Sequence, residues 1–157
     1  MTDHDMIVRL RELRRRREER ALQDVIQGHG AERRAAVIAR DASTAVSRHV
    51  RQTANAEDAA FGSLVGRPVK VASLHGLQGR FEAAAGRTEE LRDRQKAADA
   101  DRDRLASELS AARRRHHARQ LAVSKLDRLT EALDRRGARR RLALLELAEE
   151  DENGSSR

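Results

Sequence analysis

The residues best suited to specific chemistry are arginines near the N-terminus. Guanidinium groups form paired hydrogen bonds to phosphates and carboxylates, so a cluster of them predicts an anionic partner. The formal net charge of +7 and the pI of about 11.1 support the same expectation. The alternative is a solvated surface whose charge is offset by neighbouring glutamates. The cluster, called the N-terminal arginine block below, consists of Arg9, Arg11, Arg14, Arg15, Arg16, Arg17 and Arg20.

Catalytic and metal chemistry have little support in the sequence. His116 and His117 are adjacent, so on a helix they point about 100° apart, and neither a His at i+4 nor any Cys completes a ligand set. The sequence also contains no recognisable nucleophile–base pair, phosphate-binding glycine loop or convergent carboxylates. We expect a protein that is not an enzyme and has no cofactor or metal, and we expect a structural role for His116.

Long helices must position these side chains. From Leu74 to Leu147, steps of three and four residues visit 22 positions, of which 14 are Leu, Val, Phe or Ala. This repeat puts a narrow apolar seam on one side of a helix about 110 Å long, and a partner helix must cover that seam. The predicted seam positions are Leu74, Leu77, Phe81, Ala84, Thr88, Leu91, Gln95, Ala98, Arg102, Leu105, Leu109, Ala112, His116, Arg119, Val123, Leu126, Thr130, Leu133, Gly137, Arg140, Leu144 and Leu147.

The composition argues against a globular core. Charged residues make up 38% of the chain, which has one Pro, two Phe and no Trp, Tyr or Cys. Large apolar side chains are therefore too few to fill a compact interior. The mean hydropathy of −0.81 would also suit disorder, but disordered chains are rich in Pro, Gly and Ser, whereas Ala, Leu, Arg and Glu favour helices.

A first helix is expected over residues 5–61, capped by Thr2 or Asp3. Its seam has ten apolar members of sixteen, and Leu22, Val25 and Ile26 fall outside it, which predicts a stutter or kink near Gly28 and Gly30. The predicted seam positions are Ile7, Leu10, Arg14, Arg17, Ala21, Asp24, Gly28, Ala31, Ala35, Ile38, Ala42, Ala45, His49, Gln52, Ala56 and Ala59.

The helix must break where Gly62, Gly66 and Pro68 fall close together. We expect a turn over residues 62–72, a second helix over 73–149 capped by Ser73, and a frayed tail over 150–157. The result is an all-α fold, one long antiparallel two-helix coiled-coil hairpin spanning residues 1–157.

Folding the chain about its turn predicts which residues lie opposite one another. Paired residue numbers should sum to about 135, so the second helix should extend past the N-terminus. The leucines at its end, Leu142, Leu144, Leu145 and Leu147, would then be exposed and available to another chain. At the turn, apolar side chains either pack locally or form a docking surface, and the sequence leaves both open.

The predicted location of the protein follows from what the sequence lacks. Residues 1–5 are polar and do not resemble the basic start of a signal peptide, and no apolar run approaches the length of a membrane span. The absence of Cys permits a reducing compartment. We expect a soluble, cytoplasmic protein.

The turn region resembles the YscO/HrpO family of type III secretion proteins. Leu64–Leu77 reads LVGRPVKVASLHGL, similar to the family's Leu-apolar-Gly-Arg turn followed by Val and by two Leu three residues apart. Ala112-Arg113, His116, Lys125 and Leu129 follow the spacing of its second helix. Leu126 replaces a frequent aromatic residue and Pro68 a more ordinary one, and the resemblance covers about residues 6–148.

This resemblance implies a stalk protein related to FliJ of the flagellar exporter. Such a stalk inserts its terminal end into a hexameric secretion ATPase and presents its turn to the cytoplasmic domain of the export gate, at the base of the apparatus. It meets the membrane only through partners and can collect released secretion chaperones. The implied ATPase-binding residues are Arg9, Leu10, Arg11, Leu13, Arg14, Arg17, Leu142 and Leu145; the implied gate-binding residues are Phe61, Leu64, Leu74, Leu77 and Phe81.

Two other interpretations remain open from the sequence. A basic coiled coil could bind nucleic acid or act as a scaffold, although no aromatic residues are interleaved among the arginines for base stacking. The seams could also pair between two chains as a long dimer, rather than within one chain. A small-molecule substrate is not expected, because a two-helix hairpin has no enclosed pocket.

Overall fold

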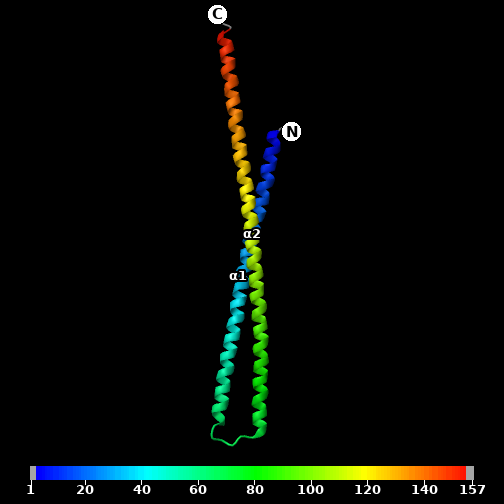
Figure 1. Cartoon of the computed structure of the whole chain (residues 1–157), viewed down its shortest axis with the longest axis vertical. Coiled ribbons are helices and arrows are strands. Elements are labelled where there is room, and N and C mark those ends of the chain that lie inside the picture. The colour runs from blue at the N-terminus through cyan, green and yellow to red at the C-terminus, as the bar shows by residue number, and fades with distance from the viewer. Residues whose placement is uncertain (1–2, 155–157) are drawn as a thin grey trace. The chain divides into compact units, whose positions relative to one another are not determined.

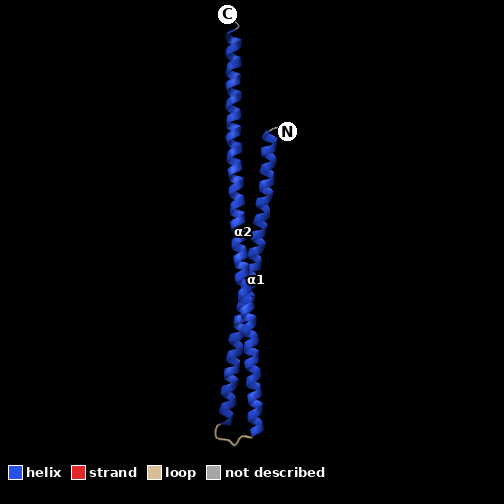
Figure 2. Cartoon of the chain, turned by 45° about the vertical axis from the view of Figure 1, so that its right-hand side comes forward, coloured by secondary structure: helices blue, strands red, loops and turns tan. Residues whose placement is uncertain are grey.

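The computed structural model describes residues 3–154, and the side chains of residues 5–148. It contains two long helices, α1 (Asp3–Leu64) and α2 (Val71–Gly154), and no strand within the described range. The helices pack against each other and are joined by one short loop (Figures 1 and 2). The predicted all-α, antiparallel two-helix coiled-coil hairpin is confirmed.

Several predicted boundaries differ from those of the structure. The loop occupies only residues 65–70, because α1 continues through Gly62. Ser73 is not a cap, since α2 already begins at Val71 and the Ser73 backbone nitrogen donates to the Lys70 carbonyl at 2.9 Å. The predicted frayed tail is also wrong as far as residue 154, because α2 continues to Gly154. Thr2, which was proposed together with Asp3 as a cap of the first helix, lies outside the described residues, and α1 already begins at Asp3.

Helix α1 ends where the sequence demands it. Gly66 adopts φ +71°, the left-handed conformation that commonly terminates a helix and that side chains disfavour. The Arg67 nitrogen donates to the Leu64 carbonyl at 3.4 Å, which satisfies one of the last carbonyls of the helix. Pro68 then prevents helical continuation. The chain is therefore free to reverse within six residues, 65–70.

The chain divides into two compact units. Unit 1 joins residues 3–25 of α1 to residues 111–154 of α2, and unit 2 contains Ile26–Ser110 with the loop. In unit 1 the pairs Glu18–His116 and Arg11–Asp127 are in contact. In unit 2 the His49 side chain contacts the Ala84 carbonyl. In every one of these pairs the two residue numbers sum to within a few of the predicted 135, so the register is confirmed.

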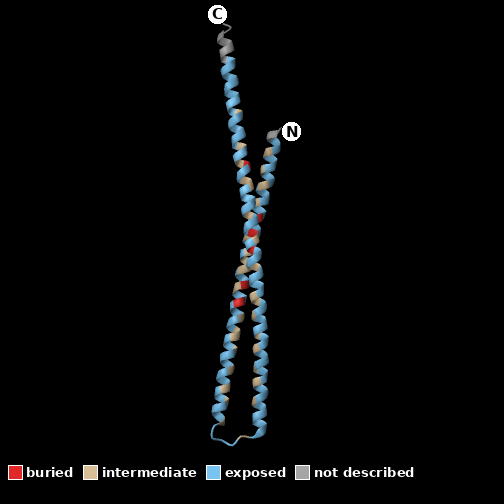
Figure 3. Ribbon diagram, in the orientation of Figure 1, coloured by how far each residue is buried: buried red, intermediate tan, exposed pale blue. Residues whose placement is uncertain are grey.

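Among the side chains of residues 5–148, the core of each unit consists of two alanines and one leucine. Unit 1 buries Ala21, Ala112 and Leu126, and unit 2 buries Ala35, Ala39 and Leu109, as the buried positions in Figure 3 indicate. Alanines bury little area each, but they allow two helix backbones to approach closely. The stability of the hairpin therefore depends heavily on the two buried leucines.

Gly28 marks one close approach within unit 2. A Cβ built on Gly28 would lie 3.5 Å from Leu109 Cδ1 and 3.9 Å from Leu109 Cβ. Helix α1 is continuous through Gly28 and Gly30, and Val25 is half-buried. The predicted stutter is not needed, because the buried and half-buried residues of α1 follow a different heptad phase from the predicted one.

The seam of α2 follows the prediction over most of its length. From Leu77 to Thr130 the predicted positions are buried or half-buried, with Arg102 and Arg119 as exposed exceptions. Leu74, at the start of the predicted seam, is 46% exposed. The heptad of leucines thus identified the packed face correctly.

The prediction of the packed face of α1 was only partly correct. Of the predicted positions at intervals of seven, Ile7, Arg14, Ala21, Gly28, Ala35, Ala42 and His49 are buried or half-buried, whereas Ala56 is exposed. Of the alternate predicted positions, Ala31 and Ala45 are half-buried, but the others are exposed and the packed residue lies one position later, so that Ile38 is 59% exposed while Ala39 is buried. Over residues 11–53, the buried or half-buried residues that lie one position after the alternate predicted ones are Arg11, Glu18, Val25, Glu32, Ala39, Val46 and Thr53. Three of these are charged, so a count of apolar residues selected the wrong phase.

Candidate interaction surfaces

An open apolar groove lies beside the loop in unit 2. It has a volume of about 390 Å³, and its lining is predominantly apolar. The rings of Phe61 and Phe81 stack with centroids 5.8 Å apart, which holds the two helices together at the groove. We call this the turn groove; its lining residues are Phe61, Leu64, Leu74, Leu77, Gln78, Phe81, Glu82 and Ala85.

The turn groove brings together all five residues implied as gate-binding. Leu64, Leu77 and Phe81 are half-buried, whereas Phe61 is 58% and Leu74 is 46% exposed. Local packing therefore accounts for part of this apolar surface and leaves the rest accessible. An apolar side chain inserted between Phe61 and Leu74 would gain the usual free energy of burying apolar area.

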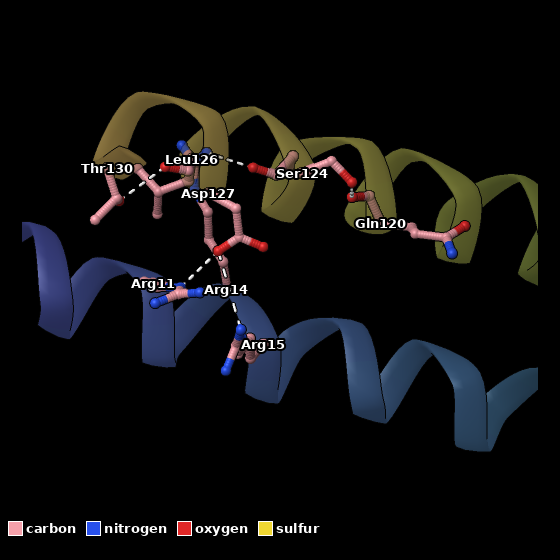
Figure 4. A network of polar contacts seen from close by, with 9 residues as sticks. Arg11, Arg14, Arg15, Gln120, Ser124, Leu126, Asp127 and Thr130 are labelled. Atoms are coloured by element: carbon pink, nitrogen blue, oxygen red, sulfur yellow. Dashed lines mark hydrogen bonds and ion pairs between the residues drawn. The ribbon is translucent and has the colours of Figure 1, made fainter. Parts of the chain in front are cut away.

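The N-terminal arginine block in unit 1 is not one uniform surface. Arg11 Nε donates to Asp127 Oδ1 at 2.5 Å, and Arg15 Nη2 lies 4.0 Å from the same oxygen. Arg14 Nη1 donates to the Ala122 carbonyl at 3.0 Å. Figure 4 shows the Asp127 carboxylate between Arg11 and Arg15, pointing toward α1. Arg11 and Arg14 thus contact α2, and the ATPase-binding role that the resemblance implies for them stays a prediction.

The other implied ATPase-binding residues of α1 are exposed. Leu10 is 42% and Leu13 is 51% exposed, and Arg9 and Arg17 also lie at the surface. Arg16 and Arg20 are exposed as well. This half of α1 therefore presents leucines and arginines together, a combination suited to an acidic partner surface with apolar pockets.

His116 has the structural role that its seam position predicted. Its Nε2 lies 2.8 Å from Glu18 Oε1, and because a carboxylate accepts, the imidazole must donate. The two side chains are only 21% and 24% exposed. His49 likewise donates from Nε2 to the Ala84 carbonyl at 3.1 Å. These contacts use the histidines to connect the two helices.

Glu18 and Asp127 are the residues that sequence reasoning missed. Neither was among the predicted seam positions, yet each accepts a hydrogen bond across the helix pair. The predicted register could have identified both acids, because residue numbers that sum to about 135 place Asp127 near Arg11 and Glu18 near His116. The apolar pattern alone could not show it.

The end of α2 is exposed as predicted. Every described side chain from residue 131 to 148 is exposed except at Gly137. Leu142 is 59%, Leu144 66%, Leu145 61% and Leu147 57% exposed. We call residues 134–154 the C-terminal overhang, because the register places the first residue of α1, Asp3, near residue 132.

On the remaining surface, charged side chains form local ion pairs. A hydrogen bond donated to Asp103 raises the pKa of Arg102, and one donated to Asp101 raises the pKa of Arg104. Both arginines are exposed and stay cationic at any physiological pH. Among the side chains of residues 5–148, no three potential metal ligands gather in one place.

Comparisons with protein-family models, curated proteins and solved structures found no match to this chain. Neither α1 nor α2, over the residues described, has an apolar stretch long enough to cross a bilayer. The arguments about function therefore rest on the hairpin and on its three exposed surfaces.

Proposed function

We propose that this chain is the non-enzymatic central stalk of a bacterial type III secretion system, in the cytoplasm at the base of the apparatus. Its terminal end would bind the hexameric secretion ATPase, and its turn would bind the cytoplasmic domain of the export gate. The hairpin would transmit asymmetry or rotation of the ATPase ring to the gate. Released secretion chaperones are a further class of partner.

The observation that supports this proposal most is the turn groove. Five residues chosen from a family resemblance, two of them on α1 and three on α2, line one open apolar cavity. A two-helix hairpin has no third element to cover such a groove, so a partner is the natural source of burial. The turn sequence that supplies the resemblance, Leu64–Leu77, contributes three of the eight residues that line the groove: Leu64, Leu74 and Leu77.

The terminal end supports the ATPase contact. Leu10 and Leu13 on α1, and Leu142 and Leu145 on α2, are all at least 42% exposed. Exposed leucines beside arginines favour a partner that offers apolar pockets rimmed by carboxylates. Arg11 and Arg14 would act indirectly, because their contacts with Asp127 and the Ala122 carbonyl hold α1 against α2.

The ATPase contact is tested by stimulation of the purified secretion ATPase. The variant Arg16→Glu/Arg17→Glu reverses exposed charge without disturbing Arg14, and should raise the concentration needed for half-maximal stimulation about tenfold or more. The matched control is Arg48→Glu/Arg51→Glu, which makes the same charge change on exposed residues of unit 2. Equal loss in both variants, or no stimulation by the unchanged chain, would count against the proposal.

The gate contact is tested by binding to the cytoplasmic domain of the export gate. Leu74→Asp places a charge in the turn groove and should abolish binding, while Val65→Asp should not, since Val65 is 79% exposed and does not line the groove. The same preparations should be assayed with duplex DNA. Tight DNA binding that falls steeply between 50 mM and 200 mM salt would favour the nucleic-acid alternative instead.

A further inference from the structure

The seam of α2 does not stop where α1 begins. Its spacing of three and four residues continues past Thr130 through Leu133, Gly137, Arg140, Leu144 and Leu147. The first residue of α1 lies near residue 132, so no described part of α1 covers the later positions. Leu144 and Leu147 are 66% and 57% exposed. An interface that is covered along most of α2 therefore continues uncovered along the C-terminal overhang.

The charges of the overhang are divided into two blocks. The first part contains Arg135, Arg136, Arg139, Arg140 and Arg141. The second part contains Glu146, Glu149, Glu150, Asp151 and Glu152. The leucines lie between the arginines and most of the acids. Two such helices would repel each other in parallel, whereas an antiparallel arrangement brings unlike charges together.

We propose that a second copy of this chain covers the overhang, with the two overhangs packed antiparallel about a twofold axis. Leu144 of one copy packs against Leu147 of the other, and Leu147 against Leu144. In this register the basic stretch 139–141 lies beside the acidic stretch 150–152 of the second copy. Because adjacent residues on a helix point about 100° apart, the two stretches attract each other as blocks of charge and not as matched pairs, and the twofold axis repeats this attraction at the other end of the interface.

The length of the overhang also suits a second copy. Residues 134–154 form about 30 Å of helix. An antiparallel partner in the proposed register ends close to the point where α1 begins, so it takes the place of α1 on the same seam. The shared seam has few leucines, and a helix pair this short is only marginally stable. The dimer should therefore be weak and dependent on concentration.

This inference does not rest on the proposed function, because it concerns the chain alone. It does add a consequence to that function. The dimer would bury Leu144 and Leu147, whereas Leu142, an implied ATPase-binding residue, points about 160° away from Leu144 and would stay accessible to the secretion ATPase. A failure of one proposal leaves the other intact, since the first is measured without any ATPase.

The leucine contact is tested by sedimentation equilibrium of the full chain over micromolar to millimolar concentrations. The average mass should rise from 17.6 kDa toward twice that value. Leu144→Asp/Leu147→Asp should raise the dissociation constant at least tenfold, to judge by the cost of burying a charge. Leu142→Asp is the control, because Leu142 points about 160° away from Leu144 on the helix and should leave the dissociation constant nearly unchanged.

The antiparallel register is tested by exchanging the two charge blocks. Arg139→Glu/Arg140→Glu/Arg141→Glu should weaken the dimer about tenfold or more, and Glu150→Arg/Asp151→Arg/Glu152→Arg should do the same. The variant that combines all six substitutions keeps the net charge and restores the complementarity, so its dissociation constant should return to within a few-fold of the original. Circular dichroism confirms that each variant keeps its helix content.

Two results would overturn the inference. A mass that stays at 17.6 kDa across the whole range would leave the overhang to a different protein. A six-substitution variant as weak as either triple variant would refute the antiparallel pairing.

Discussion

Replacement of Leu126 by Ala should destabilise unit 1 far more than the same change at Leu129. Leu126 is only 5% exposed and is the one large buried side chain among the described residues of that unit, whereas Leu129, one turn away, is 53% exposed. Both changes remove the same three carbons from the same helix and replace a good helix former with a slightly better one. The difference between the two variants therefore measures burial in the seam.

The magnitude follows from the atoms removed. Three carbons at roughly 0.8 kcal/mol each correspond to about 2.4 kcal/mol of lost transfer free energy at Leu126. A cavity would add to this loss, but the seam of a two-helix pair borders solvent and can relax, so we expect about 2–3 kcal/mol, at the low end of buried Leu→Ala changes. At Leu129 the loss should be about 1 kcal/mol or less.

Hydrogen exchange gives the appropriate measurement, because it reports the opening of unit 1 separately from unit 2. Protection of the backbone amides of residues 111–130 should fall in Leu126→Ala by an amount equivalent to about 2–3 kcal/mol, with little change in Leu129→Ala. Urea unfolding followed by circular dichroism provides a second measure of the same difference. Equal losses in the two variants would refute the packing of Leu126 between the helices.

Three further substitutions test the close approach of the helices at Gly28, the turn at Gly66 and the polar contacts of the seam at Asp127. Gly28→Ala should stabilise the chain by about 1 kcal/mol in urea unfolding, since its new methyl would meet Leu109 at 3.5 Å, an ordinary contact distance; a loss would show that the helices lie closer than described. Gly66→Ala should destabilise by about 1–2 kcal/mol in the same assay because φ is +71° there, and a neutral result would contradict that turn. Asp127→Asn should cost about 0.5–1 kcal/mol at low salt and less in 1 M NaCl, because its ion pairs with arginines are partly exposed; a loss that does not depend on salt would argue for a role other than ion pairing.

Local chemistry made the hairpin predictable. Gly66 and Pro68 determine the position of the reversal without help from the rest of the chain, and the leucines of α2 at intervals of three and four identify its packed face. Their register then follows from the turn. The turn groove was predictable for the same reason, because Phe61, Leu64 and Leu74 lie within a few residues of the loop.

The packing of α1 was not predictable in the same way. Its alternate seam positions include Arg11 and Glu18, charged residues that pattern analysis assigns to solvent. They are tolerated because Asp127 and His116 of α2 form hydrogen bonds with them. Such pairs become visible only when the register between the helices is known. The same holds for Arg14, whose acceptor is the Ala122 carbonyl, a backbone group that no side-chain pattern reveals.

The most direct test of the hairpin is a disulfide engineered across it. The chain has no cysteine, so Gly28→Cys/Leu109→Cys introduces a single pair, whose Cβ atoms would lie 3.9 Å apart, within the range of natural disulfides. Gly28→Cys/Leu105→Cys, displaced by one helical turn, serves as the control. On oxidation at micromolar concentration, the first variant should form a disulfide within one chain and migrate as a monomer in a non-reducing gel, while the control should not. Cross-linking between chains in the first variant, or equal cross-linking of the two variants, would contradict the antiparallel pairing of α1 and α2 within one chain.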